Sequence, residues 1–437
     1  MSSGLVAVLV VVAGSPVSLS LSDAQRLAAE RSPALAARRA LRDGADHRLT
    51  ASTSRLLPRL SLGVRYSRLS YVAPGQISLP FSLPNQPPPE PIQLGEAIEN
   101  AFASSVVLEQ PLFTGLSLLN QREASKRSLV AAERQLEQER QDLALRVEEA
   151  WLGLVRARQL AGVAQQSEQV LGAHLERLER MADAGAITSL EVTRTRARLA
   201  AVRVQVLQAR AAEAVARLGL VTLLGLDPDA EPTCELPADD EPAMAPGQEG
   251  VRPELIAARE VAASKEAQAR ALAGGLWPQL LARASVQFDS PNTRYFPLRN
   301  EFNPSWEASA ILSWTAWDWG ATWHTHRAAA LEAEAARHSA AQLEEAARID
   351  VARRRVDFDT AASKLEATRA AVDAAALSLQ RAQRQCEAGQ LACITVLDAE
   401  AELSRLQADL VQARIDRRLA VSQLRRATGT LSAPELP

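Results

Sequence analysis

The sequence lacks a long apolar run, a strong net charge and a cysteine-rich segment. Its formal net charge is −3, with 49 basic and 52 acidic residues interspersed, so charge gives no reason to expect a nucleic-acid partner. The apolar run of residues 5–13 is too short to cross a bilayer as a helix, and no later run is long enough. Any membrane span would therefore consist of strands closed into a barrel, because lipid cannot satisfy open sheet edges.

Cysteine is scarce, with three residues in the chain. Cys234 stands alone, whereas Cys386 and Cys393 lie seven positions apart on either side of a glycine. In an oxidising compartment a tight turn could join this pair in a disulfide, although two free thiols are the slightly favoured interpretation. Supporting ligands are missing beside this pair and beside His324 and His326, so neither a metal nor another cofactor is expected.

Residues 1–19 are predicted to be a signal peptide for secretion. The apolar run of residues 5–13 fits the core of such a signal, and small residues follow it where cleavage can occur. No lysine or arginine precedes the run, so the signal is atypical or the true start lies upstream. The alternative is a disordered, slightly apolar tail. Export is the favoured interpretation.

The chain carries an internal repeat. The octapeptide GAITSLEV begins at Gly185, and GQLACITV begins at Gly389, 204 positions later. The distance from Gly185 to Gly225 is 40 positions. The distance from Gly389 to Gly429 is also 40 positions. Equal spacing of several such marks predicts that one structural unit has been duplicated.

We predict two structural repeats, at residues 20–225 and 252–430. Residues 226–251 between them are acidic and rich in proline, which is typical of an exposed linker, and residues 431–437 form a tail. Each repeat is expected to contain a helix, a strand, a loop, a strand, a very long helix, a turn and another long helix. The glycines that open the two octapeptides mark the expected tips of the two helical hairpins.

Four segments alternate apolar and polar residues with the period of a β-strand, which gives each strand one apolar and one polar face. Their length of about nine or ten residues is that of a membrane-spanning strand. Four strands cannot close a barrel alone, since the smallest common membrane barrels have about eight. Two copies would give eight strands and a filled lumen, and three copies would give twelve strands and an opening. The predicted strands are residues 59–68, 102–112, 279–289 and 305–315.

Long helices are predicted where proline is absent. Residues 116–182 and 321–387 contain no proline, and each would run roughly 100 Å as a helix at 1.5 Å per residue. Leu129, Leu136 and Leu143 recur every seven residues, as expected for a seam between supercoiled helices. The expected fold class is therefore mainly α, with long antiparallel coiled-coil helices and a β-barrel part made of four strands per subunit.

Tryptophan is unevenly distributed along the chain. Five of the seven tryptophans surround the last predicted strand, namely Trp306, Trp314, Trp317, Trp319 and Trp323. Indole side chains favour the membrane–water boundary, so we expect the first four to be membrane-interface aromatics. The alternative interpretation is an aromatic cluster in a protein core.

An ordered set of motifs runs through nearly the whole chain after residue 20. RSPALAARRA pairs with VRPELIAARE, VLEQPLFTG and WDWG open the two long helices, and GQLACITVLDAEAEL begins the C-terminal stretch. This set resembles the TolC-like outer-membrane efflux protein family, also called the outer membrane factors. The resemblance implies a homotrimer with a twelve-stranded barrel in the outer membrane of a Gram-negative bacterium and a helical tunnel in the periplasm. It also implies a periplasmic adaptor protein and an inner-membrane pump as partners.

The same resemblance suggests residues of the periplasmic entrance. Asp398 matches one position where the family carries an acidic residue, whereas Thr395 stands where many members have aspartate. Glu191 stands where the family often has aspartate, but the segment from Thr188 to Glu191 also spells a T-x-x-E capping box. A helix cap and an entrance role are equally good interpretations of Glu191.

No arrangement of residues suggests catalysis, because a Ser-His-Asp set, a phosphate-binding loop and an evident carboxylate pair are all missing. The favoured function is a passive exit duct of a tripartite efflux pump or of a type I secretion system. The alternative is a soluble periplasmic coiled-coil scaffold or adaptor protein. That alternative explains the helices but neither the four alternating strands nor the tryptophans.

Overall fold

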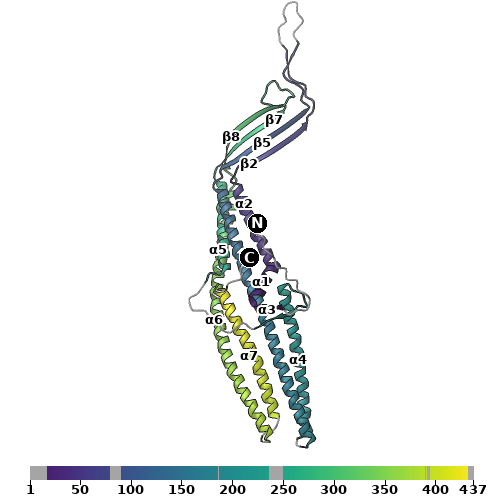
Figure 1. The fold of residues 1–437 in the computed structure, drawn as a ribbon. Coiled ribbons are helices and arrows are strands. Elements are labelled where there is room, and N and C mark those ends of the chain that lie inside the picture. Colours follow the sequence, from purple (N-terminus) through teal and green to yellow (C-terminus); the bar gives the residue numbers. More distant parts are fainter. Residues whose placement is uncertain are drawn as a thin grey trace, which may run out of the picture. The chain divides into compact units, whose positions relative to one another are not determined.

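The fold is that of a computed structural model of the 437-residue chain, and Figure 1 shows its elements in order. The structure describes residues 17–78, 90–185, 187–235, 250–388, 390 and 394–431. The chain divides into two compact units. The sheet unit comprises Arg42–Ala131 and Ala258–Ala340, and the hairpin unit comprises Met1–Leu41, Ala132–Ala257 and Ala341–Pro437.

Helices make up most of the chain, which confirms the mainly α fold class. The two long helices, α3 and α6, have 67 residues each and coincide closely with the proline-free segments. The helices are α1 (Leu21–Arg31), α2 (Pro33–Ser54), α3 (Ser117–Asp183), α4 (Ser189–Leu224), α5 (Pro253–Ala273), α6 (Ala321–Glu387) and α7 (Ile394–Ala427).

Proline sets the start of two of these helices. Pro33 and Pro253 each occupy the first helical position, where a missing N–H costs nothing and the fixed φ suits the helix. The single helix predicted at the start of the first repeat is therefore two helices, α1 and α2. The chain breaks between them at Ser32, because a residue before proline is driven out of the helical region and has an extended ψ of 118°.

The sheet unit contains one four-stranded antiparallel sheet in the order β2-β5-β7-β8. Its strands are β2 (Arg59–Arg68), β5 (Asn100–Phe113), β7 (Gln279–Ser290) and β8 (Asn303–Ser313). Strand β8 lies two residues before the predicted segment. It includes Pro304, which an edge strand tolerates because one side of its backbone has no partner in the sheet. Short two-residue strands pair elsewhere, β1 (Val17–Ser18) with β6 (Pro232–Thr233) and β3 (Gln76–Ile77) with β4 (Ile92–Gln93).

Each long helix begins after a left-handed turn that follows the sheet. Gly115 and Leu116 precede α3 with φ of 60° and 66°, and Trp319 and Gly320 precede α6 with φ of 57° and 80°. Gly115 is needed for a second reason, because a Cβ there would lie 2.3 Å from the carbonyl oxygen of Gly274. The sheet and the helices of this unit therefore meet through backbone contacts that tolerate no side chain.

The hairpin unit has an apolar core around Trp151 of α3. The side chain of Trp151 is buried and packs with residues of α1, α2, α3, α4 and α7. Its indole Nε1 donates a hydrogen bond to the backbone oxygen of Glu235 at 3.0 Å. A large aromatic ring with a satisfied N–H thus joins the helices to the segment that follows α4.

Ion pairs around the buried Arg426 link four helices of the hairpin unit. Arg426 of α7, which is 8% exposed, donates to Asp142 of α3 at 2.8 Å and to Glu254 of α5 at 3.1 Å. Arg252 donates to Glu254 at 2.7 Å and to Asp350 of α6 at 3.0 Å. Charged hydrogen bonds of this kind are stronger than neutral ones. We call these five residues the charge cluster.

The carboxyl group of Glu254 lies at the centre of the charge cluster. Burial by itself raises its pKa, but hydrogen bonds from its own backbone N–H and from Arg252, with the charge of Arg426, hold the pKa below its ordinary value. The folded protein therefore favours the ionised form of this carboxyl group.

The charge cluster predicts a large effect for Arg426→Met. This change removes the cation that Asp142 and Glu254 share, and Glu254 keeps Arg252 as a partner. We expect it to lower the free energy of unfolding by about 1–3 kcal/mol. Urea denaturation in detergent, followed by far-UV circular dichroism, measures the change. The matched control is Arg405→Met, which removes an exposed arginine paired with Glu402 on the same helix and should have little effect. Equal stability of the two variants would show that the charge cluster does not stabilise the fold.

The lowered pKa of Glu254 predicts a pH dependence. The stability that its carboxylate contributes is present above the unfolded pKa, about 4.3, and is lost as pH falls through the lower folded pKa. Glu254→Gln removes this contribution, so wild type should melt above the variant at pH 7. The difference between their melting temperatures should shrink as pH falls below about 4. A difference that stays constant down to pH 3 would show that this carboxyl group is not the source.

Candidate functional site

The first candidate site is one face of the four-stranded sheet. Cross-strand partners point to the same face, so the register assembles an apolar surface across all four strands. Val64, Leu62 and Trp306 on this face are 86%, 77% and 73% exposed. An exposed apolar surface of this extent marks a site of contact with lipid or protein. The apolar face comprises Leu60, Leu62, Val64, Tyr66, Phe102, Val106, Leu108, Ala284, Val286, Phe288, Trp306 and Ala308.

The opposite face of the sheet is polar. Arg283 and Glu109 are cross-strand neighbours and form an ion pair at 4.0 Å. The polar face comprises Ser61, Arg65, Ser105, Glu109, Arg283, Gln287, Ser305 and Glu307. The sheet is thus amphipathic, with its apolar side exposed within the single chain.

Of the four predicted interface aromatics, Trp306 lies within β8 and the other three lie between the end of β8 and the start of α6. Trp317 and Trp319 are exposed and pack edge to face with ring centroids 5.8 Å apart. Trp314 is also exposed, and its Nε1 donates to the backbone oxygen of Leu276 at 3.2 Å. These indoles do not form a buried aromatic core within the chain. Because they are exposed, these indoles can contact lipid, water or another protein chain.

The first hairpin tip lies between α3 and α4. Gly185 has φ of 73°, in the left-handed region that glycine adopts without strain. Thr188 is the N-cap of α4, but its side chain makes no capping hydrogen bond. The capping box predicted for Thr188 and Glu191 is therefore not formed in full, and Glu191 remains a half-buried acidic residue in the first turn of α4.

The second hairpin tip is described in part. Gly389 and Cys393 lie outside the described residues, so the pairing of Cys386 with Cys393 stays a prediction. Cys386 is half-buried at the end of α6 and is disulfide-bonded, so the favoured interpretation of two free thiols is wrong for Cys386. Thr395 is half-buried in the first turn of α7. Asp398 is exposed on the first turns of α7.

Asp398 lines a groove between α3, α4 and α7 with a volume of ≈ 560 Å³. Its charged lining on α7 is mainly acidic, with Glu400 and Glu402 beside Asp398, and Arg405 pairs with Glu402 at 2.7 Å. Arg198 of α4 lines the same groove. Asp398 is therefore an exposed carboxylate in a groove that also contains Arg198. The sequence does not indicate this proximity, because the two residues are 200 positions apart.

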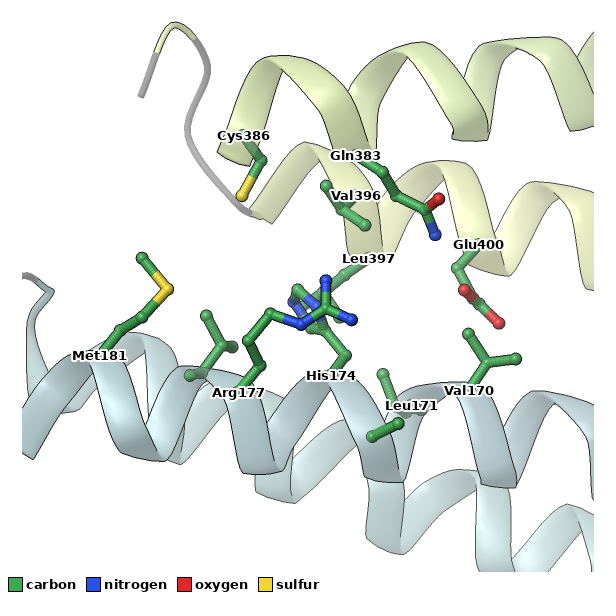
Figure 2. Close-up of a pocket in the computed structure, with 12 residues that line it drawn as sticks. Val170, Leu171, His174, Arg177, Met181, Gln383, Cys386, Val396, Leu397 and Glu400 are labelled. Atoms are coloured by element: carbon green, nitrogen blue, oxygen red, sulfur yellow. The ribbon is translucent and has the colours of Figure 1, made fainter. Parts of the chain in front are cut away.

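A second, smaller cavity adjoins this groove near the tips, and Figure 2 shows its lining. It has a volume of ≈ 220 Å³ and lies between α3 on one side and α6 and α7 on the other. Its polar residues include His174, Arg177, Gln383 and Glu400. Sequence reasoning missed this cavity, because His174 and Glu400 belong to different predicted repeats, and the motif that contains Glu400 does not indicate which residue of the other repeat lies beside it.

The described part of the chain lacks metal-ligand clusters and helices able to span a membrane. The described residues hold no group of three or more His, Cys, Asp or Glu side chains placed to bind a metal ion. Across the same residues, none of the helices combines the length and apolar character needed to cross a bilayer.

Solved structures share this fold. The outer-membrane channel OprN matches with a TM-score of 0.77 and 21% identity, covering 95% of this chain and 91% of its own. The outer membrane protein VceC from Vibrio cholerae matches with a TM-score of 0.77 and 18% identity, covering 94% and 96%. The open state of the Neisseria gonorrhoeae MtrE outer membrane channel matches with a TM-score of 0.73 and 16% identity, covering 96% of both chains.

Sequence comparison identifies the family. No curated protein sequence matches the chain. The sequence model of the outer membrane efflux proteins, however, matches residues 24–226 and 250–430, which is most of the chain and both predicted repeats. Since a match of this extent assigns membership, the chain belongs to the outer membrane efflux protein family.

Proposed function

We propose that this outer membrane efflux protein forms a homotrimeric exit duct of a tripartite pump. The observation that carries the proposal is the four-stranded sheet, which has an exposed apolar face and pairs β2 and β8 on one side only. Lipid cannot hydrogen-bond these free edges, and four strands are too few to close a barrel. Pairing β8 of one subunit with β2 of the next would satisfy both edges, and three subunits would supply twelve strands around an opening.

Duplication within the chain fits this assembly, since a trimer of duplicated units would present six similar hairpins around one axis. Both halves contain a helix, two strands of the sheet, a 67-residue helix and a shorter helix, in that order. Two consecutive residues of positive φ precede the long helix in each half. These shared features support a duplicated unit.

The partners of such a duct are a periplasmic adaptor and an inner-membrane pump. A helix of 67 residues runs roughly 100 Å, long enough to reach far into the periplasm. The duct itself is passive, so the same channel could serve a pump for small molecules or a type I secretion system. A soluble scaffold is disfavoured, because it would expose the apolar face of the sheet to water.

The entrance of the duct is proposed to lie at the hairpin tips, beside Gly185 and Gly389. Glu191 follows the first tip and Asp398 follows the second, and three copies of each would form rings of negative charge. A ring of like charge at a constriction favours ions of the opposite sign. Thr395 adds no charge, so we assign cation preference to the two acidic residues alone.

The lipid-facing assignment of the apolar face is tested with Leu62→Arg and Ser61→Arg. These neighbours lie on opposite faces of β2, and arginine facing lipid near mid-bilayer costs about 2–4 kcal/mol. We expect Leu62→Arg to reduce the SDS-resistant oligomer in the outer-membrane fraction, while Ser61→Arg assembles like wild type. If Ser61→Arg alone lost assembly, the polar face rather than the apolar face would be the one in contact with lipid. That result would contradict the proposal.

The entrance assignment is tested by conductance in planar bilayers. Glu191→Gln with Asp398→Asn should shift the reversal potential in a KCl gradient toward lower cation preference, because the charge rings are neutralised. Asp409→Asn is the control, since it removes a similar exposed carboxylate further along α7. Thr188→Ala should leave helix content unchanged, because its side chain makes no cap bond. An unchanged reversal potential in the double variant would overturn the entrance role.

A further inference from the structure

The small cavity near the hairpin tips has walls that suit an apolar group. Leu171, Leu178 and Val396 line it and are almost fully buried. Val170, Met181 and Leu397 add to the apolar part of the lining. The volume of ≈ 220 Å³ is below the roughly 300–1,000 Å³ of pockets for drug-sized ligands, so the cavity suits a smaller molecule.

His174 brings an unsatisfied nitrogen to this cavity. Its Nε2 atom is buried and has no hydrogen-bond partner among the described residues. Burial, with the nearby charge of Arg177, lowers the pKa of the imidazole, so the ring is neutral at pH 7. A buried polar atom without a partner costs free energy that a ligand with an N–H group would recover.

Glu400 brings an unpaired carboxylate to the same cavity. Figure 2 shows Glu400 and Gln383 on the side of α7 and α6, facing His174 and Arg177 on α3. Within the described part of the chain, no hydrogen bond or ion pair holds the Glu400 side chain, and burial raises its pKa. A half-buried carboxylate that lacks a cation is costly, and a bound cation would offset that cost.

We propose that this cavity binds a small amphiphilic monoamine. The ammonium group would donate hydrogen bonds to the Glu400 carboxylate and to Nε2 of His174, and an aromatic or alkyl body would fill the space between the leucine and valine side chains. Arg177 also lines the cavity, and its positive charge disfavours a second cationic group on the ligand. Gln383 offers a further polar contact from α6.

Such a ligand would contact α3 from the first hairpin and α6 and α7 from the second. A ligand that binds only when the two hairpins lie together would shift the equilibrium toward that arrangement. Binding would therefore stabilise the packing of the two hairpins within one subunit. The site lies in the wall between the hairpins, so the inference does not depend on the chain forming a duct.

The experiment titrates the full-length protein in nanodiscs with benzylamine by isothermal calorimetry, with empty nanodiscs as the blank. Wild type should bind one benzylamine per subunit. Glu400→Gln should weaken binding about tenfold, because a neutral amide replaces the charged acceptor of the ammonium group. The matched control is Glu402→Gln, since Glu402 lies on the same helix and lines the neighbouring groove but not this cavity. It should bind like wild type.

Two further probes separate the alternatives. Benzyl alcohol has the same ring without the charge and should bind more weakly than benzylamine. Benzoate should not bind, because the carboxylate of Glu400 would repel it. Absence of benzylamine binding to wild type, equal binding to Glu400→Gln, or tighter binding of benzoate would each overturn the proposal. Helix content of Glu400→Gln, measured first, should match wild type because the change removes a buried charge.

Discussion

Every backbone N–H and C=O group inside a membrane needs a hydrogen-bond partner, and the sheet of this chain leaves two edges without one. Strands β5 and β7 are paired on both sides, whereas β2 and β8 are paired on one side each. The apolar face across all four strands makes lipid the natural surroundings of the sheet. Under the proposed function, assembly of several chains would therefore be a condition for stability in the membrane, because it would pair the edges of β2 and β8.

The helices meet a different requirement, since they have to stay ordered over a great length with a small core. Alanine and leucine supply much of the packing in the hairpin unit. The large side chain of Trp151 belongs to a core cluster with residues of α1, α2, α4 and α7. The charge cluster makes this packing more specific, because its ion pairs form only between particular residues. Arg426 donates hydrogen bonds to Asp142 of α3 and Glu254 of α5, so it favours the packing of these helices where apolar contacts alone discriminate weakly.

The cavity near the hairpin tips differs from the Trp151 core and from the charge cluster. Its charges are incompletely paired, as the unsatisfied His174 and the lone carboxylate of Glu400 illustrate. Burying such groups lowers stability, and proteins tend to retain them where function requires it. The tips are also the part of the fold for which we propose the entrance. The charge cluster and the Trp151 core thus supply packing and paired charges, whereas the cavity near the tips combines a buried polar atom without a partner and a carboxylate without a cation among the described residues.

The sequence by itself determined the long helices, the four strands and the two faces of each strand, because these follow from local periodicity and from where proline is absent. It also determined the family, since the ordered motifs span both halves. It missed the break at Pro33 and the start of β8 at Asn303, where a residue before proline and an edge position decided the boundary. The charge cluster, the unformed cap at Thr188 and the cavity around His174 and Glu400 were decided by tertiary structure. They depend on side chains brought together from distant positions, and periodicity within a segment carries no information about which distant segment will pack against it.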